Sequence, residues 1–241
     1  MRWTERIRAH WCVCAAVVTL VQAGAPGAGA AQVWAGSDPV GRGAVEVSAG
    51  VVWLGGFDMG SRSAEQTRNV TSGGTTEPFA LFAARSRVAP APAAQLRVGV
   101  YLSPSISLES SVQYARPILS SSLSADAEQA PDLTADESIN RYVFDGSLLW
   151  HLTRLSFAGG RGVPFLSGGG GYLRELHERN EFVETGREYH ATAGVKVWFG
   201  RARRRAGLRA DVGASVRSGG IDLRSGRRAV PTAGVALSYL F

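Results

Sequence analysis

Apolar and polar residues alternate along eight segments of the chain, each about ten residues long. Successive residues of a β-strand point to opposite faces of a sheet, so this alternation predicts eight strands with one apolar and one polar face. The segments are 44–57, 94–103, 106–115, 141–152, 164–176, 188–199, 208–217 and 232–241. No helical period fits them equally well. The pattern therefore predicts an all-β domain.

The two faces of these strands differ sharply in chemistry. Val98, Leu108, Val195 and Leu237 are typical of the apolar face. The polar face carries five acidic and five basic residues, namely Glu46, Arg97, Glu109, Arg141, Asp145, Glu188, Lys196, Arg209, Asp211 and Arg217. Because an eight-stranded barrel is just wide enough for side chains to fill it, we expect these charges to pair across a closed interior. A solvated sheet face, which also mixes signs, is the alternative.

Alternation alone fits both a soluble barrel with an apolar interior and a membrane barrel with an apolar exterior. The lengths of the connections favour the membrane barrel in the first half of the chain, where long segments at 58–93 and 117–138 flank a tight turn at Pro104. We expect both long segments to be loops, and any recognition to lie there. In the second half the connections at 153–162 and 177–186 are equally long and do not discriminate.

Aromatic residues lie mostly near the ends of the apolar faces, where membrane barrels place their interfacial girdles. They are Trp53, Phe57, Tyr114, Tyr142, Phe144, Trp150, Tyr189, Phe199, Tyr239 and Phe241. A buried core would not require this placement. Together with the balanced charges, it predicts an eight-stranded antiparallel up-and-down transmembrane β-barrel.

The first residues are typical of an export signal. Arg2, Arg6 and Arg8 precede an apolar stretch at 11–21, and small residues follow as far as Ala31. This apolar stretch is too short to span a bilayer as a helix. We therefore expect a cleaved signal peptide at 1–31, a short periplasmic lead at 32–42 and a barrel domain at 43–241. Both cysteines of the chain lie inside the signal, which leaves the exported protein without a disulfide or a cysteine-bound metal.

The exported chain offers little catalytic chemistry. Its histidines, at 151, 177 and 190, have no spacing that would place two imidazoles on one metal, so we expect no metal and no cofactor. Asp145, Ser147 and His151 share a strand face, but Asp145 and His151 would be about 20 Å apart and could not join one triad. His190 faces the expected interior with Glu188 and Thr192, where a hydroxyl from another strand could complete a site. Filling of the interior is the commoner role for such a histidine, and we expect no catalytic residues.

The last strand alternates as Val235-x-Leu237-x-Tyr239-x-Phe241. With the export signal and the eight strands, it makes the chain resemble the small eight-stranded outer-membrane β-barrels of the OmpA-like type. The resemblance covers nearly all of the exported chain. It implies a Gram-negative outer-membrane location, contact with lipid and lipopolysaccharide, and assembly by the barrel-assembly machinery, which would read Leu237, Tyr239 and Phe241.

The resemblance also implies a structural, adhesive or surface-interaction role, with at most a narrow porin-like pore. We expect a monomer, and the ligand of the long loops cannot be read from the sequence. Basic residues are spread along the chain, which argues against nucleic acid as a partner. Two alternatives remain: a lipid A-modifying outer-membrane barrel enzyme, and a soluble periplasmic lipocalin-like binding protein.

Overall fold

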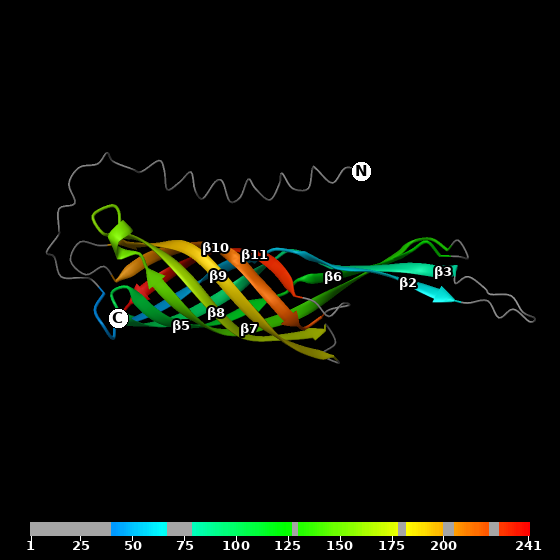
Figure 1. The fold of residues 1–241 in the computed structure, drawn as a ribbon, viewed down its shortest axis with the longest axis horizontal. Coiled ribbons are helices and arrows are strands. Elements are labelled where there is room, and N and C mark those ends of the chain that lie inside the picture. The colour runs from blue at the N-terminus through cyan, green and yellow to red at the C-terminus, as the bar shows by residue number, and fades with distance from the viewer. Residues whose placement is uncertain (1–39, 67–78, 127–129, 178–181, 200–204, 222–226) are drawn as a thin grey trace, which may run out of the picture. The chain divides into compact units, whose positions relative to one another are not determined.

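A computed structural model describes residues 40–66, 79–126, 130–177, 182–199, 205–221 and 227–241. Within these residues the chain forms eleven β-strands and one short 3₁₀ turn, η1 (Thr153–Leu155) (Figure 1). The strands are β1 (Val45–Leu54), β2 (Phe57–Gln66), β3 (Phe79–Val88), β4 (Ala91–Ser103), β5 (Ile106–Ala115), β6 (Ile118–Ser124), β7 (Leu133–His151), β8 (Gly162–His177), β9 (Val183–Phe199), β10 (Ala206–Gly219) and β11 (Arg228–Leu240). No helix in the described part of the chain is long and apolar enough to cross a membrane.

Eight of these strands close into an antiparallel barrel, which confirms the predicted fold class. Their order is β7-β5-β4-β1-β11-β10-β9-β8, and β8 pairs with β7 to complete the ring. At the junction of the first and last strands, the Phe241 amide donates to the Val45 carbonyl at 2.8 Å. Closure leaves no strand edge in the barrel, as a lipid environment requires.

The barrel is staggered. The paired residues can be followed around the ring, starting with Ala115 of β5 and its partner Ala93 of β4. After one circuit they lead back to the chain beside β5 at Ser105, whose carbonyl accepts a hydrogen bond from the His151 amide. The strands are therefore offset by ten residues per circuit, or a little over one residue per strand, so they tilt relative to the barrel axis.

Apolar side chains of the barrel point outward and charged side chains point inward. The exposed fractions of Leu108 and Leu237 are 55% and 68%, whereas those of Glu109 and Lys196 are 6% and 2%. The glycine-rich β8 keeps the same alternation, with Leu166 and Tyr172 outward and Phe165 and Leu173 inward. The outward-facing apolar surface is thus the one that sequence alternation indicates.

Most of the described residues in the two long segments at 58–93 and 117–138 form strands, so the prediction of loops is wrong for them. Strands β2, β3 and β6 and residues 133–138 of β7 pair in the order β2-β3-β6-β7 as a four-stranded sheet, which we call the extension (Figure 1). Its strands continue β1, β4, β5 and β7 beyond the barrel. Serine and arginine interrupt the apolar alternation in these segments, so the sequence pattern does not predict strands there. The strands form because they pair with neighbouring strands.

Short breaks mark the boundary between barrel and extension in three of the four continued strands. They are Gly55-Gly56, Ala89-Pro90 and Arg116-Pro117, whereas β7 crosses the boundary without a break. At the Gly56 position a Cβ atom would lie 2.7 Å from the Val88 carbonyl oxygen, so a larger residue would clash with the backbone. These breaks allow each strand to bend away from the barrel wall and still pair with its neighbour in the extension.

One facing predicted from the sequence is wrong as a result. Phe57, placed with the outward aromatic residues, comes after the Gly55-Gly56 break and packs inward against the buried cluster of Met59, Val88, Ile139 and Ile221. The guanidinium carbon atoms of Arg217 and Arg228 lie 5.3 and 5.7 Å from the centre of its ring. The break shifts the phase of the alternation by one face.

The two ends of the barrel differ. At the first, which we call the turn end, the chain begins β1, ends β11 and makes the connections β4–β5, β7–β8 and β9–β10. At the second, the loop end, the extension continues the barrel wall. Figure 1 shows the C-terminus at the turn end and β2, β3 and β6 beyond the opposite end.

Candidate functional site inside the barrel

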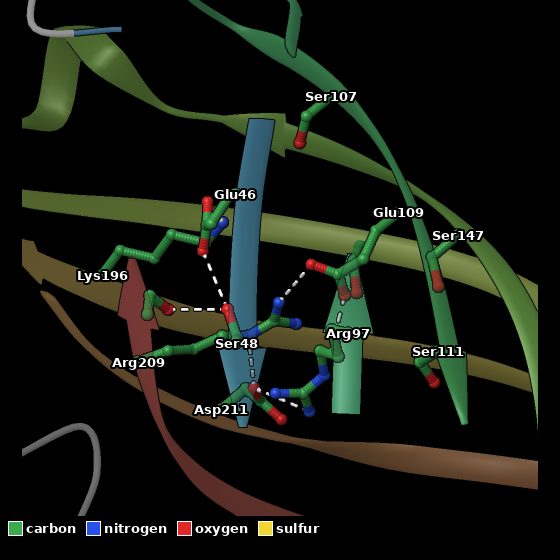
Figure 2. Close-up of polar contacts among 12 residues, drawn as sticks. Glu46, Ser48, Arg97, Ser107, Glu109, Ser111, Ser147, Lys196, Arg209 and Asp211 are labelled. Atoms are coloured by element: carbon green, nitrogen blue, oxygen red, sulfur yellow. Dashed lines mark hydrogen bonds and ion pairs between the residues drawn. The ribbon is translucent and has the colours of Figure 1, made fainter. Parts of the chain in front are cut away.

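The interior of the barrel is filled by layers of ion pairs and buried side chains. Nearest the turn end, the Lys196 ammonium lies 2.6 Å from the Glu46 carboxylate (Figure 2). The Tyr101 hydroxyl donates to the same oxygen at 2.8 Å. Tyr101 belongs to a buried cluster with Trp198 and Leu240. This layer closes the turn end of the interior.

A second layer joins four charges from three parts of the barrel wall (Figure 2). Arg209 on β10 donates to Glu109 on β5 and to Asp211 on its own strand, each at 2.7 Å. Arg97 on β4 lies 3.7 Å from the Glu109 carboxylate and 3.5 Å from that of Asp211. Two arginines and two carboxylates therefore neutralise one another in a buried layer.

A third layer lies toward the loop end and is centred on Glu188. Its carboxylate accepts hydrogen bonds from Arg141, at 2.5 Å, and from Arg217, at 3.0 Å. Arg141 also lies 3.9 Å from Glu175, whose carboxylate accepts the Ile221 amide at 2.9 Å. Beyond this layer, the apolar cluster of Met59, Val88, Ile139 and Ile221 is buried.

Glu175 is an inward charge that sequence reasoning missed. It is 5% exposed and lies on β8, where the run of glycines hides the alternation. Counting in steps of two from the outward Leu166 and Tyr172 would have placed it inside. The signal was present, because side-chain direction in a strand alternates even where glycine carries no side chain.

Polar side chains line a cavity of about 50 Å³ between the second and third layers. The Ser147 hydroxyl lies 3.1 Å from His190 Nε2 and donates to Asp145 at 3.2 Å, while Ser111 donates to the other oxygen of Asp145 at 2.6 Å. Gly169 of β8 separates Ser147 from His190, and a Cβ atom there would lie 2.9 Å from the histidine ring. The absence of a side chain at this position allows the contact between β7 and β9.

Serine, histidine and aspartate thus meet, but not in the arrangement of a catalytic triad. A triad needs the carboxylate on the imidazole, where it orients the ring and stabilises its protonated form. Asp145 instead accepts from Ser147 and Ser111, and among the described residues no hydrogen bond joins it to His190. His151, as expected, is elsewhere: it bonds Ser107 at 2.9 Å and stacks on Tyr101.

The ten charges singled out in the sequence all lie on the inner wall. Nine of them are buried and make ion pairs, whereas Asp145 is half-buried and, among the described residues, accepts hydrogen bonds from the hydroxyls of Ser111 and Ser147. Leu237, Tyr239 and Phe241 lie on the outer face at the turn end, where the rings of Tyr239 and Phe241 meet edge to face at 4.8 Å. In the part of the chain that the structure describes, no three potential metal ligands come together.

No family model matches the chain, and no curated protein matches it. Among solved structures it is similar to Ail, the attachment invasion locus protein of Yersinia pestis, with 11% identity and a TM-score of 0.37, over 83% of this chain and 99% of that one. It is also similar to the outer membrane protein AlkL in DMPC lipid bilayers, with 12% identity and a TM-score of 0.38, over 90% of this chain and 95% of that one.

The architecture follows from the chain's own pairing and burial. A closed eight-stranded antiparallel ring, with an apolar outer face and a charged inner face, satisfies every strand edge and presents hydrocarbon-compatible side chains outward. These are the properties of a transmembrane β-barrel of the small outer-membrane type.

Proposed function

We propose that the protein is a Gram-negative outer-membrane barrel with a closed interior, whose extension makes contacts outside the membrane. The observation that carries this proposal is the opposite placement of apolar and charged residues in the barrel, combined with a paired sheet beyond it. In this view the barrel is an anchor, and the extension is the part that meets other molecules.

The outward apolar face supports an anchor in lipid and opposes a soluble lipocalin-like binder. A lipocalin-like barrel would gather Val98, Leu108 and Leu237 around its ligand and leave the charges in water. Here those three side chains are exposed, and Arg97, Glu109 and Lys196 are buried. Only a lipid environment makes this arrangement favourable, because the exposed apolar surface would otherwise be hydrated.

The filled interior supports an anchor rather than a pore. Three layers of paired charges and two buried apolar clusters lie along the interior, and the polar cavity between the second and third layers is about 50 Å³, enough for a few waters. An ion would have to break buried pairs at each layer in order to pass.

The two faces of the extension differ, and this supports a role in surface contact. On one face Leu123 and Leu133 are directly paired and exposed, with Phe82 nearby on the adjoining β3. On the other face Arg85 pairs with Asp58, and Ser120 donates to Asp136 at 2.5 Å. Exposed apolar side chains on a sheet surrounded by water are a feature of protein-binding surfaces.

Fractionation of cells expressing the full chain tests the location. We expect the protein in the outer membrane, with the faster gel migration of a folded barrel when the sample is not heated. In planar bilayers we expect no stable conductance. Recovery from the soluble periplasm, or a steady ion current through the wild-type protein, would contradict the anchor.

The contact role is tested by display of the full chain and of a variant in which short turns replace the extension. We expect cells displaying the full chain to aggregate or to attach to protein-coated surfaces more than cells displaying the variant. The variant must retain heat-modifiable migration, which controls for barrel folding. Equal attachment by both forms would remove the extension from the proposal.

The contact between Ser147 and His190 is the one observation that favours a lipid A-modifying enzyme. The buried position of Ser147, inside the ring, opposes it, since acyl chains run along the outer face. We therefore expect Ser147→Ala and His190→Ala to leave the lipid A of expressing cells unchanged, as measured by mass spectrometry. A change that appears with wild-type protein and disappears with Ser147→Ala would establish the enzyme instead.

A further inference from the structure

Two arginines lie side by side on the lipid-facing side of the barrel wall near the loop end. Arg174 on β8 is paired with Thr185 of β9, and Arg187 of β9 is paired with Tyr172 of β8. The two arginines are therefore diagonal neighbours on one face of the β8–β9 pair, with their backbone positions about 7–8 Å apart across the two strands. Both side chains are exposed.

Neither guanidinium has a partner among the described residues, in contrast to the arginines inside the barrel. Each arginine of the interior layers lies against at least one carboxylate. Two like charges at diagonal positions repel each other when nothing lies between them. An anion that bridges the two would remove this repulsion.

Tyrosines surround the two arginines on the same outward face. Arg174 is paired with Tyr142 of β7, and Tyr142 in turn is paired with Tyr114 of β5, with ring centres 5.1 Å apart. Tyr172 and Tyr189 lie two residues from Arg174 and Arg187 along their own strands, and both are about half exposed. Tyrosine at the edge of an apolar band marks the level at which hydrocarbon gives way to headgroups.

The stagger of the barrel brings a third arginine to this level. With an offset of a little over one residue per strand, Arg116, which directly follows the loop-end terminus of β5, lies within about one residue of the height of Arg174 and Arg187. The outward positions at the same height on the other side are Ser218 on β10 and Ala229 on β11. At this height, the outward arginines among the described residues therefore lie on the side formed by β5, β7, β8 and β9.

We propose that Arg174 and Arg187, with Arg116 at the flank, form a binding site for the phosphate groups of a lipid headgroup in the outer leaflet, namely those of lipopolysaccharide. Guanidinium groups bind phosphate in a bidentate manner, and the neighbouring tyrosine hydroxyls can donate to further oxygens. The source of the phosphate is a lipid because the arginines lie directly above an apolar band that the acyl chains would cover. This inference rests on the proposed outer-membrane location.

The purified, folded barrel in detergent provides the test. Binding is followed as the rise in the temperature at which gel migration changes from folded to unfolded while purified lipopolysaccharide is added. We expect Arg174→Gln with Arg187→Gln to weaken the apparent affinity about tenfold or more, since two charge-assisted contacts are lost. Arg174→Lys with Arg187→Lys should recover only part of it, because an ammonium is a point charge and not a planar fork.

The matched control is Arg154→Gln with Arg161→Gln, which removes the same charge from two exposed arginines at the turn end. We expect the control to bind as the wild type does, and dephosphorylated lipopolysaccharide to bind equally weakly to all forms. Equal weakening by the control pair would reduce the effect to net charge and overturn the site. Saturation by inorganic phosphate alone, with no further effect of the lipid, would overturn the lipid source.

The outcomes separate this site from the proposed function. If the double glutamine variant is found in the outer membrane and binds lipopolysaccharide in detergent with wild-type affinity, the binding site is overturned and the proposed location stands. Wild-type protein that is absent from the outer membrane would overturn the location, whereas the detergent measurement would still report whether the arginines bind phosphorylated lipid.

Discussion

The extension continues four of the eight barrel strands, but the two regions hold their charges in opposite ways. Inside the barrel, Arg209 and Asp211 form an ion pair whose side chains are 3% and 7% exposed. In the extension, the Arg85–Asp58 pair is 58% and 46% exposed. The two pairs have similar chemistry and lie in different dielectric surroundings, so their contributions to stability differ.

The solvent on each side of a sheet determines whether apolar and polar residues alternate along its strands. In the barrel, lipid on one side and a closed interior on the other require strict alternation, as in β5, where Leu108 points outward and Glu109 inward. The extension has no such lipid-facing wall, and serine, arginine and leucine occur together on β3 and β6. Alternation is therefore a sign of two different solvents across a sheet and not of a strand as such.

The largest effect should come from breaking an interior pair. Arg209→Ala leaves Glu109 and Asp211 buried without their closest cation, and we expect a loss of about 3–5 kcal/mol in the free energy of unfolding. Urea titration of the refolded barrel, followed by gel migration, measures it. The matched change in the extension, Arg85→Ala, should leave the midpoint unchanged. Equal shifts for the two variants would show that burial does not distinguish the regions.

The next effect concerns the outer face. Leu96 lies near the middle of the apolar band and is about half exposed. Because its surroundings are hydrocarbon, Leu96→Arg should destabilise the barrel in lipid vesicles by about 2–4 kcal/mol. Leu123→Arg, at an exposed leucine of the extension, should have little effect on the same titration. A small cost for Leu96→Arg would place that face in water.

A smaller effect should follow from filling space inside the wall. At Gly171 a Cβ atom would lie 2.2 Å from the Phe144 carbonyl oxygen, so we expect Gly171→Ala to cost about 1–3 kcal/mol by forcing β7 and β8 apart. Gly146 faces outward with nothing within 4 Å of such an atom. Gly146→Ala should therefore be neutral or slightly stabilising in the same assay, and a reversed order would contradict the inward facing of Gly171.

The smallest effect should be a pH response confined to the extension. The hydrogen bonds from Arg85 and from the Gly60 amide lower the pKa of Asp58 below its ordinary value of 3.8. The contribution of the Arg85–Asp58 pair to stability is therefore fully present above pH 3.8, and it is lost as the pH falls through the lowered pKa of Asp58. The amide resonance of Gly60 should titrate with a midpoint below 3.8, and Asp58→Asn should abolish the titration. A midpoint above 3.8 would show that the pair does not form.

Much of the barrel could be predicted because each of its strands carries its own evidence. Alternation places Glu46, Arg97 and Lys196 on the inner face without knowledge of any neighbour. The extension could not be predicted in this way, since β2 and β3 satisfy their backbone groups by pairing with each other and with β6. Phe57 was misplaced for a related reason: the Gly55-Gly56 break changes the facing of the strand, and alternation does not report breaks.

The facing of the candidate-site residues could likewise be predicted from the sequence, but the contacts between them could not. That Ser147 and His190 face inward follows from alternation, but their contact depends on Gly169 of the intervening strand and on the register of β8 with both neighbours. The pairing of Arg209 with Glu109, a hundred residues away, likewise depends on barrel closure.

The sequence by itself determined that eight strands have one face for hydrocarbon and one for charge, because the direction of a side chain in a strand is a local property with a period of two. The tertiary structure alone decided which charges meet, which strands continue beyond the barrel, and that Arg174 and Arg187 are neighbours. Those features depend on register and stagger, which are set by closure of the whole ring and not by any one strand.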